Sequence, residues 1–517
     1  MTSTVRPSKS PIAAVPFVAR LFAVTELKST SLNAANDNVV IPTYDRASTI
    51  PGIVHFGLGG FSRAHLAMYV DRLLNRGDAD EWAVSGVGLM PLDEKMRDTL
   101  AAQDRLYTLI TRASDGEPDA HIIGSIAEYL YAPDDPEAVI ERLAAPTTRI
   151  VTLTVTEAGY SPVNPADIDI PADGDSRGTR SESDAAPTTV WGYLLAGLMR
   201  RAERGIPPFT VLSCDNIQGN GSIARAALVS YARAVDFDWA DRIVTDVAFP
   251  NSMVDRITPA TTADDIDTVE RITGLRDAWP VSSERFEQWV IEDNFPAGRP
   301  AFESVGAQFV ADVAPYEKMK LRLLNASHQA MSYLGILEGF SFVHDVVRDD
   351  DFAAFLRGYM REEAAPTLDA VAGIDLAAYQ EDLIARFSNH AIKDTLARQV
   401  VDGSDRIPKF LLPVIVDQIQ AGGDAQRCAL VLAAWQAVLL RGAIHPEDRA
   451  ITSDNRLDEL EAAALADEEQ PGAFLARLPM RDIHDERFTR AYLRSRVELR
   501  ELGPRGAVLS ANRRAMR

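Results

Sequence analysis

One short segment carries an unusual set of side chains for proton transfer. The stretch 316–328 reads YEKMKLRLLNASH and holds Glu317, Lys320, Asn325 and His328 within a helical pattern. At about 100° per residue, these four side chains fall at about 60°, 0°, 140° and 80° around a helix, with leucines in the same arc. Because buried Lys, Asn and His are costly without a purpose, this face predicts a functional site.

Such a face suits hydride transfer from a secondary alcohol, which requires a base for the hydroxyl proton and donors for the developing alkoxide. A desolvated lysine becomes a base once its pKa falls from about 10.4 toward neutrality. Amide N–H groups can hold the oxyanion. Asn325 fits that role, and so does Asn216, which follows an apolar run at the position where open α/β sheets bind ligands. Lys320 is therefore the expected base.

Each residue also has a plainer interpretation. A single histidine on an apolar helix face is more often a core residue, and asparagine after a strand is more often a turn former. Zinc would be the rival role for His328, but the sequence has no HExxH motif, no cysteine cluster and no second nearby histidine. The joint occurrence favours lysine chemistry without a metal.

A glycine-rich turn near the start of the chain is typical of dinucleotide binding. Gly57, Gly59, Gly60 and Phe61 follow an apolar strand pattern and open into a helical one. Glycines there allow a tight turn and let backbone N–H groups approach a pyrophosphate. Ser62 stands where the strict motif has a third glycine, so a purely structural turn remains open.

Two carboxylates follow the second predicted strand. Asp93 and Glu94 could accept hydrogen bonds from an adenosine ribose and repel a 2′-phosphate, which favours NAD over NADP. They lie later than the usual spacing of about 20 residues after the motif, and either alone is also compatible with a solvated turn.

The surrounding pattern alternates short β-branched runs with helical stretches and later becomes helical throughout. It predicts an α/β protein with a Rossmann-type N-terminal domain and a mostly parallel sheet, followed by a mainly helical C-terminal domain. The expected divisions are an N-terminal extension (1–45), a nucleotide-binding domain (46–305), a helical domain (306–502) and a basic tail (503–517). A polar excursion spans 163–189.

Composition narrows the classes of function. The formal net charge of -22 over 517 residues disfavours nucleic acid as a partner, and no run of about 18 apolar residues indicates a membrane span. Two cysteines, Cys214 and Cys428, exclude a disulfide framework and fit a reducing, cytoplasmic setting. The first 45 or so residues are predicted to be a loosely attached extension and not a signal peptide, and the basic tail is expected to be solvated and mobile.

From about residue 53 to 412, the chain resembles the polyol-specific long-chain dehydrogenases. The resemblance rests on GLGGFSRAH, LTVTEAGY, SCDNIQGNG, FPNSMVDRITP and KLRLLNASHQAMSYLG. It implies NAD as cofactor, a small polyol or ketose as substrate, no metal and a monomeric enzyme. The roles it implies are a base (Lys320), an oxyanion site (Asn216, Asn325), substrate contacts (Asp255, His328, Arg398), a proton path (Glu317) and neighbours of the nicotinamide (Glu157, Tyr160).

The sequence departs from the family pattern near the expected substrate. Arg406 takes a place that is often lysine, and His390 stands where Asn-Pro is common. The expected reaction is oxidation of D-mannitol to D-fructose. The alternatives are arabinitol or sorbitol dehydrogenases, or a fructuronate or tagaturonate reductase, which would need an added cationic contact near Arg398 or Arg406. A nucleotide-binding regulatory protein would keep the fold without the chemistry.

Overall fold

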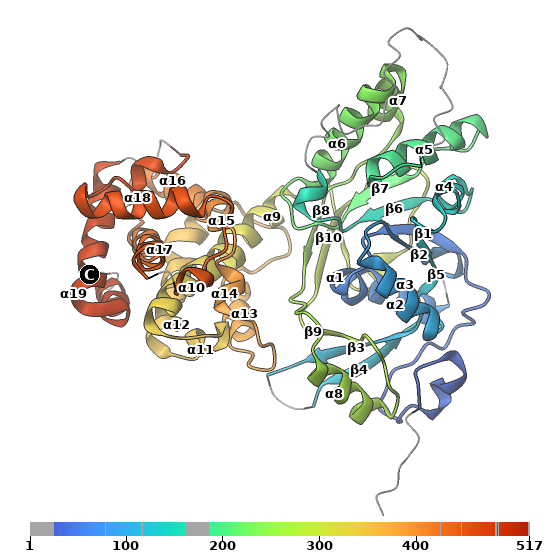
Figure 1. Cartoon of the computed structure of the whole chain (residues 1–517), viewed down its shortest axis with the longest axis horizontal. Coiled ribbons are helices and arrows are strands. Elements are labelled where there is room, and N and C mark those ends of the chain that lie inside the picture. Colours follow the sequence, from blue (N-terminus) through green and yellow to red (C-terminus); the bar gives the residue numbers. More distant parts are fainter. Residues whose placement is uncertain are drawn as a thin grey trace, which may run out of the picture.

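The computed structural model describes residues 25–77, 79–114, 117–160, 186–423, 425–445, 447–480, 483 and 485–514. An N-terminal part of sheets and helices is followed by a C-terminal part made of helices, and α9 (Ala314–Lys320) leads from one to the other (Figure 1). The predicted fold class is confirmed.

The main sheet is fully parallel, as the apolar runs of its strands predict. Its order is β5 (Ile126–Tyr131), β2 (Ala83–Gly88), β1 (Pro51–Phe56), β6 (Ile150–Leu153) and β7 (Thr210–Ser213). Ile53 packs into the cluster around α2 (Leu66–Arg76), whereas Val54 packs on the opposite face beneath α5 (Val190–Glu203). Burial on both faces explains why these strands are apolar at consecutive positions.

The strand order reverses direction at β1, with β2 on one side and β6 on the other. Open α/β sheets bind ligands beside the carboxyl ends of strands at such a switch point. Helices complete the two faces of this layer. They are α1 (Gly60–Ala64), α3 (Asp93–Ala102), α4 (Pro136–Ala144), α6 (Asn220–Val235) and α7 (Phe237–Asp246).

Two small mixed sheets extend the N-terminal part. One has the order β4 (Asp119–Ile123), β3 (Tyr107–Arg112) and β9 (Val281–Glu284), and α8 (Ala263–Thr273) packs beside it. The other has the order β11 (Gln308–Val310), β10 (Gln288–Glu292) and β8 (Ser252–Asp255). The second sheet brings β8 next to the lysine helix.

The C-terminal part is a helical assembly around α10 (Ala326–Glu338) and α17 (Gln426–Ile444). The other helices are α11 (Val343–Val347), α12 (Asp350–Gly358), α13 (Leu376–Phe387), α14 (Leu396–Gln399), α15 (Gly403–Phe410), α16 (Leu412–Gln420), α18 (Leu457–Glu469) and α19 (Glu486–Arg514). Among the described residues, only α17 is long and apolar enough to cross a membrane, and 72% of its apolar window is buried inside this domain.

Two expectations about the chain ends were wrong for the residues that the structure describes. Leu27 and Val39 of the N-terminal extension are buried against the β3–β4 sheet, so this part is attached by its own small core. The expected mobile tail forms a helix that resumes after a kink at Gly503 and continues to Arg514, and Arg505 near its start pairs with Glu338, Asp349 and Asp351. Residues 1–24, most of the 163–189 excursion and 515–517 lie outside the described residues.

Candidate active site

A cleft of about 730 Å³ opens at the carboxyl ends of β1, β6 and β7 and is closed on its other side by the C-terminal helices. Cavities of this size hold small ligands and cofactors. Its walls come from the segments after the three strands, from β8 and the residues that follow it, and from the helical part of the chain from Lys320 onward. The lining includes residues 57, 59–62, 154, 156–158, 214–217, 254–258, 320, 324–325, 328–329, 398–399, 402, 405–406 and 409–410.

The glycine turn lies on the cleft wall, as predicted. Gly57 has φ +87°, and a Cβ atom there would lie 2.1 Å from the Thr154 carbonyl oxygen, so only glycine fits. A Cβ at Gly59 or Gly60 would meet nothing closer than 3.7 Å, which leaves the backbone accessible from the cleft. Phe61 also lines the wall. The open loop at a strand switch point fits a dinucleotide.

The acidic pair stands just after β2 and outside the cleft lining. One carboxylate oxygen of Asp93 accepts the backbone N–H groups of Leu89 and Met90 at 2.9 Å each, so Asp93 shapes the loop that leads into α3. Glu94 is exposed, and among the described residues its one ion pair is with Arg97. The structure therefore leaves Glu94 as the freer of the two carboxylates.

Glu157 and Tyr160 lie in the loop after β6 but behave differently. Glu157 lines the cleft and pairs with Lys409 of the C-terminal part at 2.9 Å. Tyr160 is buried behind the loop, where its hydroxyl donates to Asp215 at 2.6 Å. The Asp215 carboxylate also accepts the backbone N–H of Thr156, which has a strained φ of +64°. Tyr160 thus braces the cleft loop and is not part of the lining.

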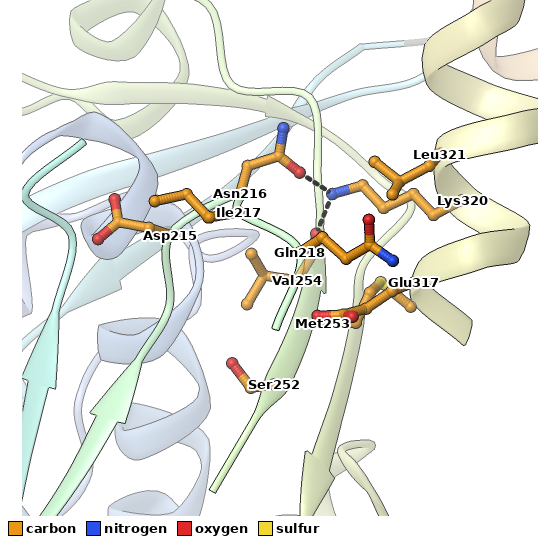
Figure 2. Close-up of a pocket in the computed structure, with 10 residues that line it drawn as sticks. All are labelled: Asp215, Asn216, Ile217, Gln218, Ser252, Met253, Val254, Glu317, Lys320 and Leu321. Atoms are coloured by element: carbon orange, nitrogen blue, oxygen red, sulfur yellow. Dashed lines mark hydrogen bonds between the residues drawn. The ribbon is translucent and has the colours of Figure 1, made fainter. Parts of the chain in front are cut away.

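Lys320 and Asn216 meet directly, although 104 residues separate them. The Lys320 ammonium nitrogen donates to Asn216 Oδ1 and to the Val254 carbonyl oxygen, both at 2.6 Å (Figure 2). The lysine is 7% exposed, whereas Asn216 faces the cleft. Because Lys320 occupies the amide oxygen, the amide nitrogen of Asn216 is left to donate to a ligand.

The environment of Lys320 favours its neutral form. Burial lowers the pKa of its amine below the ordinary value; Asp255 and Glu317 oppose this shift, and Arg386 reinforces it. A buried amine with a depressed pKa can accept a proton near neutrality. The predicted base therefore has the electrostatic setting that the chemistry needs.

A π turn brings Asn325 and His328 closer to the lysine than a regular helix would. Residues 321–325 form the turn, and the Ala326 N–H donates to the Leu321 carbonyl oxygen. The extra residue per turn moves Asn325 and His328 to about 40° and −20° from Lys320, so the face is narrower than the α-helical pattern predicts. Such turns occur often at functional sites.

Two buried polar atoms on this face lack protein partners. Asn325 Oδ1 and His328 Nδ1 make no hydrogen bond with the described residues. Burial lowers the pKa of His328 to about 4, so its ring is neutral in ordinary buffers. Unpaired buried polar atoms are costly, and both residues line the cleft, so they fit hydroxyl groups of a ligand.

Glu317 lies on the other side of the lysine, in a separate cavity of about 20 Å³ that Lys320 and Asn216 also line. That volume suffices for one water molecule. The carboxylate accepts the Gly219 N–H at 3.0 Å, and burial raises the pKa of Glu317 to about 7. Glu317 and Lys320 thus line one small cavity that adjoins the main cleft at Asn216 and Lys320.

The two arginines lie at the far wall of the cleft, where sequence patterns placed the substrate. Asp394 accepts from Arg398 at 2.9 and 3.1 Å and so balances its charge. Arg406 donates to the backbone carbonyl oxygens of Arg398 and Gln399 and makes no ion pair with the described residues. Of these two arginines, Arg406 is therefore the one without an ion pair among the described residues.

Three further residues at or beside the cleft were missed from the sequence: Arg386, Glu284 and Gln329. Arg386 donates to both oxygens of Asp255, at 2.9 and 3.0 Å, and also to Glu284. Gln329 lines the cleft with a buried Oε1 that has no partner among the described residues. Asp255 and Arg386 are 131 residues apart, so no local pattern could pair them. For Gln329 the only signal was its place one residue after His328.

The predicted site residues otherwise gather as expected around one cleft. Lys320, Asn216, Asn325, His328 and Asp255 surround its inner end. The part of the chain that the structure describes holds no group of three or more His, Cys, Asp or Glu side chains that could bind a metal ion.

Comparisons with known proteins agree with this geometry. Residues 51–304 match the mannitol dehydrogenase Rossmann domain, and residues 312–497 match the mannitol dehydrogenase C-terminal domain. Mannitol 2-dehydrogenase of Phaeosphaeria nodorum is 45% identical over 86% of this chain and 78% of its own length.

Two solved structures are also similar over nearly the whole chain. The ternary complex of Pseudomonas fluorescens mannitol 2-dehydrogenase with NAD and D-mannitol has a TM-score of 0.81 and 39% identity, covering 95% of this chain and 100% of that one. A D-sorbitol dehydrogenase in substrate-free form has a TM-score of 0.81 and 34% identity, covering 94% and 100%. This chain belongs to the mannitol dehydrogenase family.

Proposed function

We propose that this protein oxidises a secondary alcohol of a polyol to a ketose with NAD, and that D-mannitol and D-fructose are the preferred pair. The observation that carries the proposal is the buried Lys320 amine, bonded to Asn216 at the inner end of a cleft that begins at the glycine turn. The relatives named for mannitol support the substrate, and the complex of one of them with NAD supports the cofactor.

In the proposed reaction, the neutral Lys320 amine accepts the hydroxyl proton of the polyol. The amide N–H groups of Asn216 and Asn325 then donate to the oxygen as negative charge develops on it. NAD bound along Gly57–Phe61 supplies the hydride acceptor when present. His328 and Asp255 hold neighbouring hydroxyl groups, and Glu317 passes the proton from the lysine toward solvent. No metal takes part.

A hexuronate reductase is the second candidate, because Arg406 is a cation in the cleft wall without an ion-pair partner among the described residues. A substrate carboxylate could satisfy it. Arg398 gives no such support, since Asp394 already balances its charge.

A panel of substrates separates these functions. Absorbance of the reduced cofactor would be followed, with NAD or NADP for mannitol, sorbitol and arabinitol and with NADH or NADPH for fructose and fructuronate. We expect the largest kcat/KM for mannitol with NAD and for fructose with NADH, because Asp93 and Glu94 place negative charge after β2. A larger kcat/KM for fructuronate would favour the reductase, and equal efficiency with NADP would contradict the role of the acidic pair.

The pH dependence of the two directions should be opposite. Oxidation needs the unprotonated amine, so its kcat should rise with pH and level off above the pKa of Lys320, which burial holds below the usual lysine value. Ketose reduction needs the protonated amine and should decline over the same interval. Profiles measured in both directions with one buffer series test this, and two profiles of the same sign would contradict a single shared base.

A further inference from the structure

A buried charge cluster adjoins the inner end of the cleft. Arg386 lies between two carboxylates and donates to Asp255 at 2.9 and 3.0 Å and to Glu284 at 2.9 and 2.8 Å. The side chains of Arg386, Asp255 and Glu284 are 7%, 5% and 3% exposed. One guanidinium thus balances two acids in a region that water barely reaches.

The cluster connects the two parts of the molecule. Asp255 ends β8 and Glu284 ends β9 of the N-terminal part, whereas Arg386 belongs to α13 of the C-terminal part. The guanidinium also lies 3.8 Å from the ring centre of Phe286. Its position is therefore fixed from both sides, and Asp255 has both oxygens held in one plane by a bidentate donor.

Stability alone is a weak explanation for this arrangement. Buried ion clusters often contribute no more than apolar side chains of the same size, because desolvation offsets their attraction. Of the two acids, only Asp255 lines the cleft. The cluster therefore places a charged acceptor beside the reacting group at an energetic cost, which indicates a function.

The charge of Asp255 acts on Lys320 from close by. An unbalanced carboxylate would stabilise the ammonium form and so oppose proton acceptance. The other charged or titratable groups around these two residues come from several elements. They are Arg386 and Tyr379 (α13), Glu317 (α9), His328 (α10) and His65 (between α1 and α2). Among them, only Arg386 pairs directly with Asp255 in the structure.

We propose that Arg386 is a positioning residue of this reaction: it aims the Asp255 carboxylate at a substrate hydroxyl and offsets its charge, so that Lys320 can stay neutral. Glu284 competes for the same guanidinium and therefore limits how much positive charge reaches Asp255. The inference rests on the proposed role of Lys320 as the base.

Opposite shifts in the pH profile test this arrangement. Arg386→Gln should move the rise of kcat for polyol oxidation to higher pH by about one unit, because Asp255 then acts on Lys320 without compensation. Glu284→Gln should move the same rise to lower pH, because Arg386 then serves Asp255 alone. A structural role would lower the melting temperature in both variants without shifts of opposite sign.

Two further variants keep the test decisive if Arg386→Gln folds poorly. The double variant Arg386→Gln with Glu284→Gln removes one charge of each sign and should still show the shift to higher pH. Arg386→Lys keeps the charge but loses the bidentate geometry. It should raise the KM for polyol about tenfold or more, with a smaller pH shift, because the Asp255 carboxylate then loses its bidentate donor.

Arg112→Gln is the matched control. Arg112 pairs with Asp265 at 2.7 Å, and both side chains are largely buried, but neither lines the cleft. This variant should lose stability and keep the pH profile. Wild-type-like profiles in all the Arg386 and Glu284 variants, or shifts of the same sign in Arg386→Gln and Glu284→Gln, would overturn the role of Arg386. A wild-type profile without a rise would instead overturn the lysine mechanism, and this inference with it.

Discussion

Replacing Lys320 with alanine is expected to lower the kcat of polyol oxidation by at least about 10²–10⁴-fold, the usual contribution of a general base. Among the described residues that line the cleft, the one other neutral side chain able to act as a base is His328, whose pKa burial lowers to about 4. Affinity for NADH should change much less, because the glycine turn is not altered. Steady-state kinetics and NADH titration measure the two effects.

Lys318→Ala is the control, since Lys318 lies on the same helix but pairs with Asp369 outside the cleft. It should retain near-normal kcat. Small primary amines should partly restore the Lys320→Ala variant. Retention of more than about a tenth of normal turnover by that variant, with an unchanged pH profile, would exclude Lys320 as the base and make His328 the first replacement to test.

Replacing Asn216 with alanine is expected to lower kcat by about 10²–10³-fold, as when an oxyanion donor is lost. The same change removes the oxygen that accepts from Lys320, so the amine loses one of its two hydrogen-bond partners. We therefore expect the pH profile to shift as well, whereas the KM for polyol should rise less than kcat falls.

Asn36→Ala provides the comparison for Asn216, because the Asn36 amide binds the Ile272 carbonyl oxygen at 2.7 Å and lies outside the cleft lining. Its kinetics should match the wild type. If Asn216→Ala instead raised KM alone and left kcat intact, the amide would bind the ground state and the alkoxide equally, and its assignment as an oxyanion donor would be wrong.

Local sequence patterns were enough for the fold class and for the lysine helix. Apolar runs at the strands and the spacing of Glu317, Lys320, Asn325 and His328 are properties of short segments, so they can be interpreted without knowing the fold. The π turn could not be predicted, because an α-helical period was assumed and nothing in LRLLN marks an added residue. The sequence therefore predicted which residues share the polar face of the helix, but not the narrower angle over which the π turn gathers them.

Contacts between segments that lie far apart in the chain could not be predicted from the sequence. The pairing of Asp255 with Arg386 depends on how α13 packs against β8, and the hydrogen bond from the Tyr160 hydroxyl to Asp215 likewise joins segments 55 residues apart. The prediction of a mobile tail was wrong for the same reason, since the three acidic residues that pair with Arg505 lie over 150 residues earlier in the chain. Composition describes a segment and does not identify its neighbours.

The π turn also limits how this region can change in length. Deleting one residue between Leu321 and Asn325 would give a regular α-helix with Asn325 and His328 four and seven residues after Lys320, at about 40° and −20°, where the π turn already holds them. Inserting one residue there would instead rotate both side chains by about 100°, away from Lys320, although no functional side chain had been removed. The site should therefore tolerate the loss of the extra residue in this turn better than the gain of another.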